Sequence, residues 1–135
     1  MTHLLDTSAA LAHYWGEAGA DRVDELLREA GVSIGISVLS VFEIAQAVAH
    51  RTGDDKEGGT VANVYAGLAH EIAPVSMETV REGLDLRRSA TARIALADCL
   101  IAATAAQNGA VLVHRDPHFS TLPAERPRQE VLPPK

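Results

Sequence analysis

The amino-acid sequence predicts an α/β fold with three layers, in which helices cover both faces of a mostly parallel central sheet. Short apolar segments typical of buried strands alternate with longer segments of helical periodicity along the chain. The chain has 135 residues, of which 47% are hydrophobic, and this suffices for one domain with a sizeable core. We therefore expect a single domain over residues 1–135, with a tail from about residue 123.

The first half of the chain predicts two strands and three helices. The helix over 18–30 is amphipathic with its charged residues outward, and Gly31 ends it. Ser37 is placed to cap the N-terminus of the third helix. The predicted strands cover 2–5 and 32–36, and the predicted helices cover 8–15, 18–30 and 38–50.

The second half continues this alternation after a polar, glycine-rich segment. Residues 52–59, TGDDKEGG, are predicted to form a loop. Ser76 is placed to cap one helix, and Gly109 is placed to end another. The predicted helices are one with Val61, Val64, Tyr65 and Leu68 on its apolar face, one after Ser76 and a buried one before Gly109. The predicted strands cover 72–75 and 110–113, with an edge strand over 130–132.

Charge and cysteine content limit the classes of partner. The formal net charge is −6, so the chain as a whole does not attract nucleic acid. Ten of the twelve cationic residues are arginines, which suit bidentate phosphate contacts and keep local anion binding open. Cys99 is the only cysteine, and no segment is typical of a signal peptide or membrane span, so we expect a cytoplasmic protein. The arginines expected to contact phosphate are Arg87, Arg88, Arg93 and Arg115.

Asp98 is the one formally charged residue in a long apolar segment, 94–114. Small and apolar residues cover nearly all faces of its helix, which is typical of a buried helix. A lone carboxylate is costly in such surroundings unless another group compensates its charge. Asp98 is therefore either an N-cap that binds the amides of Leu100 or Ile101, or part of a functional site.

Three further acids are predicted to share one edge of the sheet with Asp98. Asp6 and Asp116 each follow a predicted strand, and Glu43 is the only acid of the helix over 38–50. Each has an ordinary explanation: Asp6 as an N-cap, Asp116 as a turn residue before proline, and Glu43 as an exposed glutamate. However, parallel strands point the same way, so the residues that follow them meet at one edge.

Four carboxylates at one edge repel each other and destabilise the fold unless a cation separates them. Oxygen ligands suit Mg²⁺ or Mn²⁺ better than zinc. Such ions activate water and stabilise a phosphodiester during in-line hydrolysis. His114 and His118 are four residues apart, but Pro117 argues against one helix presenting both to a zinc ion. We therefore expect a magnesium or manganese site made by carboxylates.

Three motifs and a following aromatic residue carry a family resemblance. The segments LLDTSAAL, ISVLSVFEIAQ and ADCLIAATAAQNGAVLVHRD, with Phe119 after them, resemble the motifs of PIN-domain ribonucleases. They are most similar to VapC-type toxins of bacterial toxin–antitoxin pairs. The resemblance implies a PIN-like α/β/α fold and an endoribonuclease that depends on Mg²⁺ or Mn²⁺. It also implies that the catalytic metal ligands are Asp6, Glu43, Asp98 and Asp116.

The resemblance extends to neighbouring residues and to partners. Thr7 or Ser8 matches the small hydroxyl residue that the family has beside its first acid. Many relatives have threonine where this chain has His114, and an acid where it has His118. Because of these departures, we expect one bound ion. The family further implies an RNA substrate, a homodimer, and a cognate antitoxin that lays a helix and an arginine-bearing tail across the active groove.

Two other enzyme classes place an aspartate after the first strand but fit less well. A phosphatase of the haloacid dehalogenase type needs a second aspartate two residues on, where this chain has Ser8, and a later lysine. A phosphoacceptor receiver domain needs that lysine too, and the core of this chain lacks one. The remaining alternative is a PIN-like binding or interaction module without significant catalysis. The presence of all four acids weighs against it.

Overall fold

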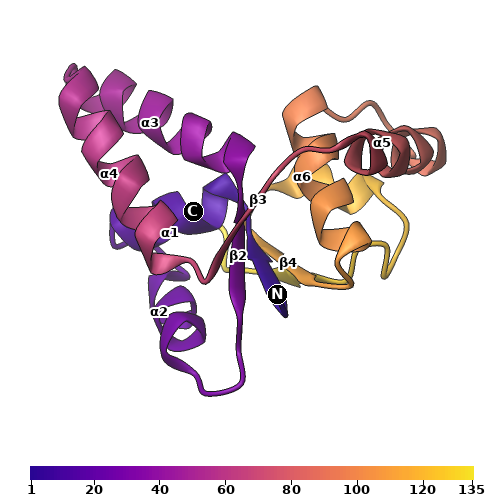
Figure 1. Ribbon diagram of the computed structural model, residues 1–135, viewed down its shortest axis with the longest axis horizontal. Coiled ribbons are helices and arrows are strands. Elements are labelled where there is room, and N and C mark those ends of the chain that lie inside the picture. Colours follow the sequence, from indigo (N-terminus) through magenta and orange to yellow (C-terminus); the bar gives the residue numbers. More distant parts are fainter.

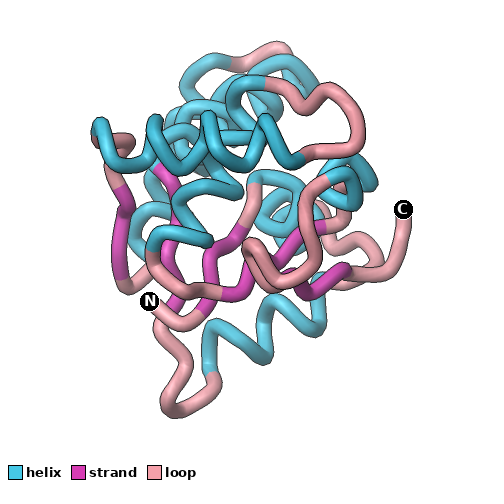
Figure 2. Tube along the Cα trace, turned by 90° about the vertical axis from the view of Figure 1, so that its right-hand side faces the viewer, coloured by secondary structure: helices cyan, strands magenta, loops and turns pink.

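The computed structural model describes residues 1–135 and contains one five-stranded sheet between helices (Figures 1 and 2). The strand order is β3-β2-β1-β4-β5, and every neighbouring pair is parallel. This confirms the predicted α/β fold. The strands are β1 (His3–Leu5), β2 (Ile34–Ser37), β3 (Glu71–Ala73), β4 (Val111–His114) and β5 (Gln129–Val131).

Helices cover both faces of the sheet and complete the three layers. α5 (Met77–Ser89) and α6 (Leu96–Gln107) lie on one side, whereas α3 and α4 lie on the other (Figure 1). None of the helices combines the length and the apolar character that crossing a bilayer requires. The remaining helices are α1 (Thr7–Tyr14), α2 (Ala20–Arg28), α3 (Val38–Thr52), α4 (Asp55–Leu68) and the short 3₁₀ helix η1 (Pro117–Thr121).

Alternate residues of the central strands enter two different apolar layers, as the two-residue period of a strand requires. Leu4 and Leu112 pack with residues of α5 and α6, together with Phe119. Leu5 and Val113 pack on the opposite face with residues of α1 and α2. Strands β1 and β4 are thus buried on both faces, which explains why the consecutive residues Leu4–Leu5 and Val111–Val113 are all apolar.

The helix ends confirm three predictions made from single residues. Ser37 caps α3 by accepting a hydrogen bond from the amide of Leu39. Ser76 caps α5 and forms a reciprocal capping box with Thr79. Gly109 follows α6 with a left-handed φ of 61°, a conformation that glycine adopts without strain.

The predicted loop over 52–59 is wrong over most of its length, because α4 begins within it. Only Gly53 and Asp54 separate α3 from α4. Gly53 has a left-handed φ of 73°, and the Asp54 side chain caps α4. At Gly58, an added Cβ would lie 2.3 Å from the carbonyl oxygen of Ala45. Gly58, which was part of the predicted loop, instead allows α3 and α4 to pack closely.

The C-terminal segment contributes the edge strand that was predicted there. β5 pairs with β4, and the adjacent Leu132 is buried in the layer that contains α1 and α2. Residues 133–135 are exposed. The segment that we expected to be a tail from about residue 123 is therefore part of the folded domain as far as Leu132.

The order of the strands determines where a site can form. The chain proceeds from β1 to β2 and β3, and then returns to the other side of β1 for β4. The direction of winding therefore reverses beside β1. In open parallel sheets, ligand sites form at the carboxyl ends of the strands beside such a reversal. Asp6 follows β1, and Asp116 lies just beyond β4.

Candidate metal centre

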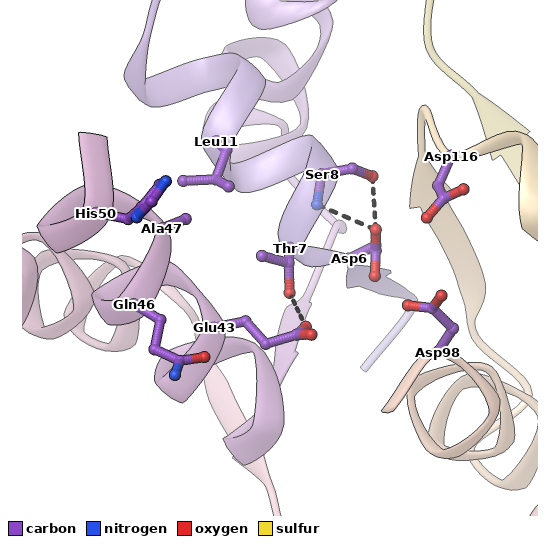
Figure 3. A pocket seen from close by; sticks show the side chains of 10 residues that line it. All are labelled: Asp6, Thr7, Ser8, Leu11, Glu43, Gln46, Ala47, His50, Asp98 and Asp116. Atoms are coloured by element: carbon purple, nitrogen blue, oxygen red, sulfur yellow. Dashed lines mark hydrogen bonds between the residues drawn. The ribbon is translucent and has the colours of Figure 1, made fainter. Parts of the chain in front are cut away.

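Asp6 is almost completely buried, with 3% of its surface exposed. Its Oδ2 caps α1 and accepts hydrogen bonds from the amide of Ser8 (3.0 Å) and from Ser8 Oγ (2.5 Å). Its Oδ1 is buried and has no hydrogen-bond partner. Figure 3 shows this second oxygen on the side that faces Asp98. Asp6 thus caps the helix with one carboxylate oxygen, Oδ2, and keeps the other, Oδ1, for a role in a site.

Ser8 connects Asp6 to the end of β4. Its Oγ donates to Asp6 and accepts a hydrogen bond from the backbone amide of Arg115 (3.1 Å). The Arg115 side chain is only 8% exposed and forms an ion pair with Glu17. This ion pair and the burial of the guanidinium argue against the predicted phosphate contact of Arg115, although its second terminal nitrogen, Nη1, is buried without a hydrogen-bond partner.

Two of the other predicted phosphate-binding arginines also have partners within the protein. Arg87 donates to the carbonyl oxygen of Ile94, and Arg88 donates to Asp85. Arg93 is exposed and forms no hydrogen bond with another side chain. Of these three arginines only Arg88 is paired with an acid, so Arg87 and Arg93 keep their positive charge for the predicted contact with an anion.

Glu43 reaches the site from the second turn of α3. Thr7 Oγ1 donates a hydrogen bond to Glu43 Oε1 at 2.6 Å and lies 3.0 Å from Ser40 Oγ. The two candidate hydroxyl residues therefore have separate partners, because Thr7 orients Glu43 whereas Ser8 orients Asp6. Both acids are fixed before any ligand binds.

Asp98 lies in the first turn of α6 but does not cap it. The N-cap is Ala95, which makes no side-chain hydrogen bond, and the carboxylate of Asp98 has no hydrogen-bond partner in the protein. Burial raises the pKa of Asp98, and the charges of Asp116 and Glu43 raise it further. An unpartnered carboxylate among other acids is an arrangement typical of a metal ligand.

Asp116 caps η1 and contacts His118. Its Oδ1 accepts a hydrogen bond from the His118 amide (2.9 Å) and lies 2.7 Å from Nδ1 of the same histidine. One ligand atom from each of Asp98, Asp116 and His118 lies within 4.8 Å of the others. These three residues could hold a metal ion, with the exposed His118 at the rim of the site.

His114 supports the backbone of Asp116 instead of joining His118 at a metal. It is buried, its Nδ1 accepts a hydrogen bond from the Asp116 amide (3.1 Å), and its Nε2 lies 2.8 Å from Gln129 Oε1. Because Nδ1 is an acceptor, Nε2 carries the proton and donates to Gln129. Burial lowers the pKa of His114, which favours this neutral ring. Both ring nitrogens are therefore already engaged.

The four predicted acids converge on one open cavity of about 600 Å³ (Figure 3). Burial raises the pKa of Asp6 to about 7, and repulsion from Asp98 and Glu43 adds to this rise, although the hydrogen bonds from Ser8 oppose it. A divalent cation relieves this repulsion and provides a partner for the buried Oδ1 of Asp6. The carboxylate oxygens, with one imidazole at the rim, fit Mg²⁺ or Mn²⁺.

Sequence reasoning missed the part of the cavity that extends beyond Glu43. Leu11 of α1 and three residues of α3, Gln46, Ala47 and His50, line this part. The sequence does contain a signal for two of them. Gln46 and His50 follow Glu43 by three and seven residues, and this spacing places all three on one face of a helix.

Comparison with known proteins supports the fold along almost the whole chain. A family model described as the PIN domain matches residues 3–125. A chain of VapBC2 from Rickettsia felis, solved with a promoter DNA fragment, is 19% identical, with a TM-score of 0.77 and coverage of 98% of this chain and 100% of that one. A chain of a toxin–antitoxin complex from Klebsiella pneumoniae is 19% identical, with a TM-score of 0.66 and coverage of 90% and 93%.

A third solved structure is that of a toxin with a stated target. VapC20 from Mycobacterium tuberculosis, described as cleaving the Sarcin-Ricin loop, is 17% identical, with a TM-score of 0.69 and coverage of 88% of this chain and 93% of that one. None of the curated proteins compared with this chain is significantly similar in sequence. At these identities the solved structures establish a shared fold.

Proposed function

The chain belongs to the PIN-domain family, and we propose that it is an endoribonuclease that depends on Mg²⁺ or Mn²⁺. We further propose that it is the toxin of a toxin–antitoxin pair and acts in the cytoplasm. Similarity to VapC20, a toxin described as cleaving the Sarcin-Ricin loop, supports this proposal. The family and the fold agree with the metal-binding chemistry of the acidic cavity. That chemistry follows from the side chains of the cavity, without reference to the family.

The observation that carries the proposal is the buried, unpartnered Oδ1 of Asp6. A protein that used Asp6 only as a helix cap would have no reason to bury a second carboxylate oxygen without a partner beside Asp98. The repulsion among these acids lowers the stability of the fold, and a binding cation offsets that cost. An interaction module without catalysis gives no account of this arrangement.

The residues of the cavity divide into those that would hold the cation and those that orient them. We propose Asp6, Asp98 and Asp116 as the principal ligands, with His118 beside Asp98 and Asp116 at the rim, and Glu43 lies across the cavity from Asp98 and Asp116 (Figure 3). A bound cation supplies Lewis-acid activation of water and neutralises charge on the scissile phosphate. Ser8 fixes the carboxylate of Asp6, which limits the reorganisation that ligand binding requires.

Two protein partners belong to the proposal, a cognate antitoxin and a second copy of this chain. The similar chain from Klebsiella pneumoniae was solved in a toxin–antitoxin complex, which supports the first. Large apolar side chains near the acids support the second. Phe42 on α3 is 64% exposed and Leu96 on α6 is 67% exposed, and these residues lie close in sequence to Glu43 and Asp98.

RNA cleavage by the purified protein tests the proposed activity. The wild type should cleave RNA with Mg²⁺ or Mn²⁺ and stop when EDTA removes the metal. Asp98→Asn should lower the rate by orders of magnitude, because it removes a charge that the cation needs. Asp21→Asn, which changes an exposed acid on α2, is the matched control and should cleave as the wild type does. A wild type that cleaves no RNA with either ion would contradict the proposal.

A further inference from the structure

The cavity is larger than a cation and one phosphate require. The acids lie toward one end, and Leu11, Gln46, Ala47 and His50 line the other (Figure 3). A volume of about 600 Å³ is within the range of sites that hold small organic ligands. We propose that the end beyond Glu43 binds a nucleotide of single-stranded RNA next to the scissile phosphate. This inference rests on the proposed function.

Gln46 and His50 provide the polar groups that a nucleobase needs. They lie four residues apart on α3, so they are neighbours on one face of the helix. Both side chains are exposed, and neither has a hydrogen-bond partner in the protein. An amide and an imidazole together offer donors and acceptors to the edge of a base. Between them, the small side chain of Ala47 leaves room for a flat ring, and Leu11 adds an apolar wall.

A cation and an aromatic ring follow in the same direction. Arg51 comes directly after His50, and its guanidinium lies 4.2 Å from the centroid of the Trp15 ring. Arg51 forms no ion pair in the protein. Trp15 caps the C-terminus of α1, and it packs with Leu11 against the same apolar cluster of α3 and α4. Arg51 does not line the cavity itself, but from Glu43 to Arg51 the axis of α3 advances about 12 Å, which a few nucleotides of single-stranded RNA can span beyond the lining residues.

These groups fit RNA better than they fit a basic peptide. When a cation offsets the charge of the acids, a peptide with arginines loses its main attraction to the cavity and is still repelled by Arg51. Single-stranded RNA instead offers unstacked bases to Gln46 and His50, and a phosphate to Arg51. Because the chain carries a net charge of −6, RNA binding depends on a few local groups of this kind.

Binding of labelled six-nucleotide RNAs, one of each base, tests the proposal in an Asp98→Asn background that leaves the RNA intact. The double substitution Gln46→Ala and His50→Ala should weaken binding of the preferred RNA about tenfold or more. Arg51→Ala should weaken binding of all four RNAs and reduce the slope of log affinity against log salt by about one. Arg81→Ala, at an exposed arginine of α5 without an ion pair, should change neither.

The controls separate this inference from the proposed function. In the otherwise wild-type protein, the Gln46 and His50 substitutions should leave the Mn²⁺-induced rise in melting temperature intact, which shows that the fold and the acids are preserved. RNA affinity that is unchanged in the double variant overturns the inference. A double variant that loses binding of a basic peptide but still binds RNA as the parent protein does also overturns the inference. If RNA binds through these residues but the wild type does not cleave it, the inference holds and the nuclease proposal fails.

Discussion

Asp6 couples the stability of the protein to the chemistry of the site. Burial raises its pKa from 3.8 to about 7, so between these values the folded state keeps a proton that the unfolded state has released. The contribution of Asp6 to the free energy of unfolding therefore becomes less favourable as the pH rises from about 4 to about 7. Above that range a cation is the natural replacement for the proton.

The substitution Asp6→Asn tests this coupling in the metal-free protein. Asparagine caps a helix as well as aspartate and does not ionise, so the variant avoids the cost of a buried charge. Its free energy of unfolding in urea with EDTA should exceed that of the wild type by about 4 kcal/mol at pH 8, and the difference should vanish near pH 4. A variant that is less stable than the wild type at pH 8 would contradict the account.

Single residues also show what the sequence could and could not decide. Asp6 and Asp116 follow buried strands, and both turned out to cap a helix while facing the site. The sequence could not decide whether Asp98 caps its helix or belongs to a site. The true N-cap is Ala95, and alanine is a poor cap, so the sequence does not show where the helix begins. The burial of Arg115 was invisible for another reason, since its partner Glu17 is 98 residues away.

Among the elements, the α3–α4 hairpin shows where local sequence signals mislead. Three glycines and several charged residues within 52–59 are typical of a loop, yet most of this segment is helical. Gly58 is present because the two helices approach closely there, and this contact depends on tertiary structure. Helix periodicity is more informative, because Glu43, Gln46 and His50 have the spacing of one helix face, and all three line the cavity.

A pair of glycine substitutions in α4 tests that packing. Gly58→Ala places a Cβ against the carbonyl oxygen of Ala45 and should lower the free energy of unfolding by about 1–3 kcal/mol. Gly59→Ala meets open space and should raise it by about 0.5–1 kcal/mol, because alanine favours the helix. Urea unfolding of both variants measures the opposite signs. If both stabilise the protein, the helices do not pack as described.

At the scale of the whole molecule, exposed apolar side chains on α3 and α6 lead to a prediction about assembly. Covering Phe42 and Leu96 with the same surface of a second copy removes apolar area from water. Light scattering at micromolar concentration should therefore give twice the monomer mass of 14.3 kDa. Phe42→Ser should shift the protein toward the monomer. A wild type that is monomeric under these conditions would exclude the dimer and leave the fold unaffected.

The arrangement of the whole sheet explains why the acids meet. The all-parallel order directs the ends of β1 and β4 to one edge, and α3 and α6 bring Glu43 and Asp98 to the same place. The alternation of strands and helices was sufficient to predict this convergence from sequence. The distances within the site were not predictable, because they depend on how Thr7 and Ser8 hold their neighbours.

The melting temperature with and without Mn²⁺ tests most directly whether these acids share a cation. An ion that binds only the folded protein stabilises it by mass action, so wild-type protein at about 100 times the dissociation constant should melt about 10 °C higher. In Asp98→Asn this rise should shrink, while the metal-free variant should melt no lower than the wild type, because one repelling charge is gone. A variant that keeps the full Mn²⁺-induced rise would contradict the central claim that Asp98 binds metal with its neighbouring acids.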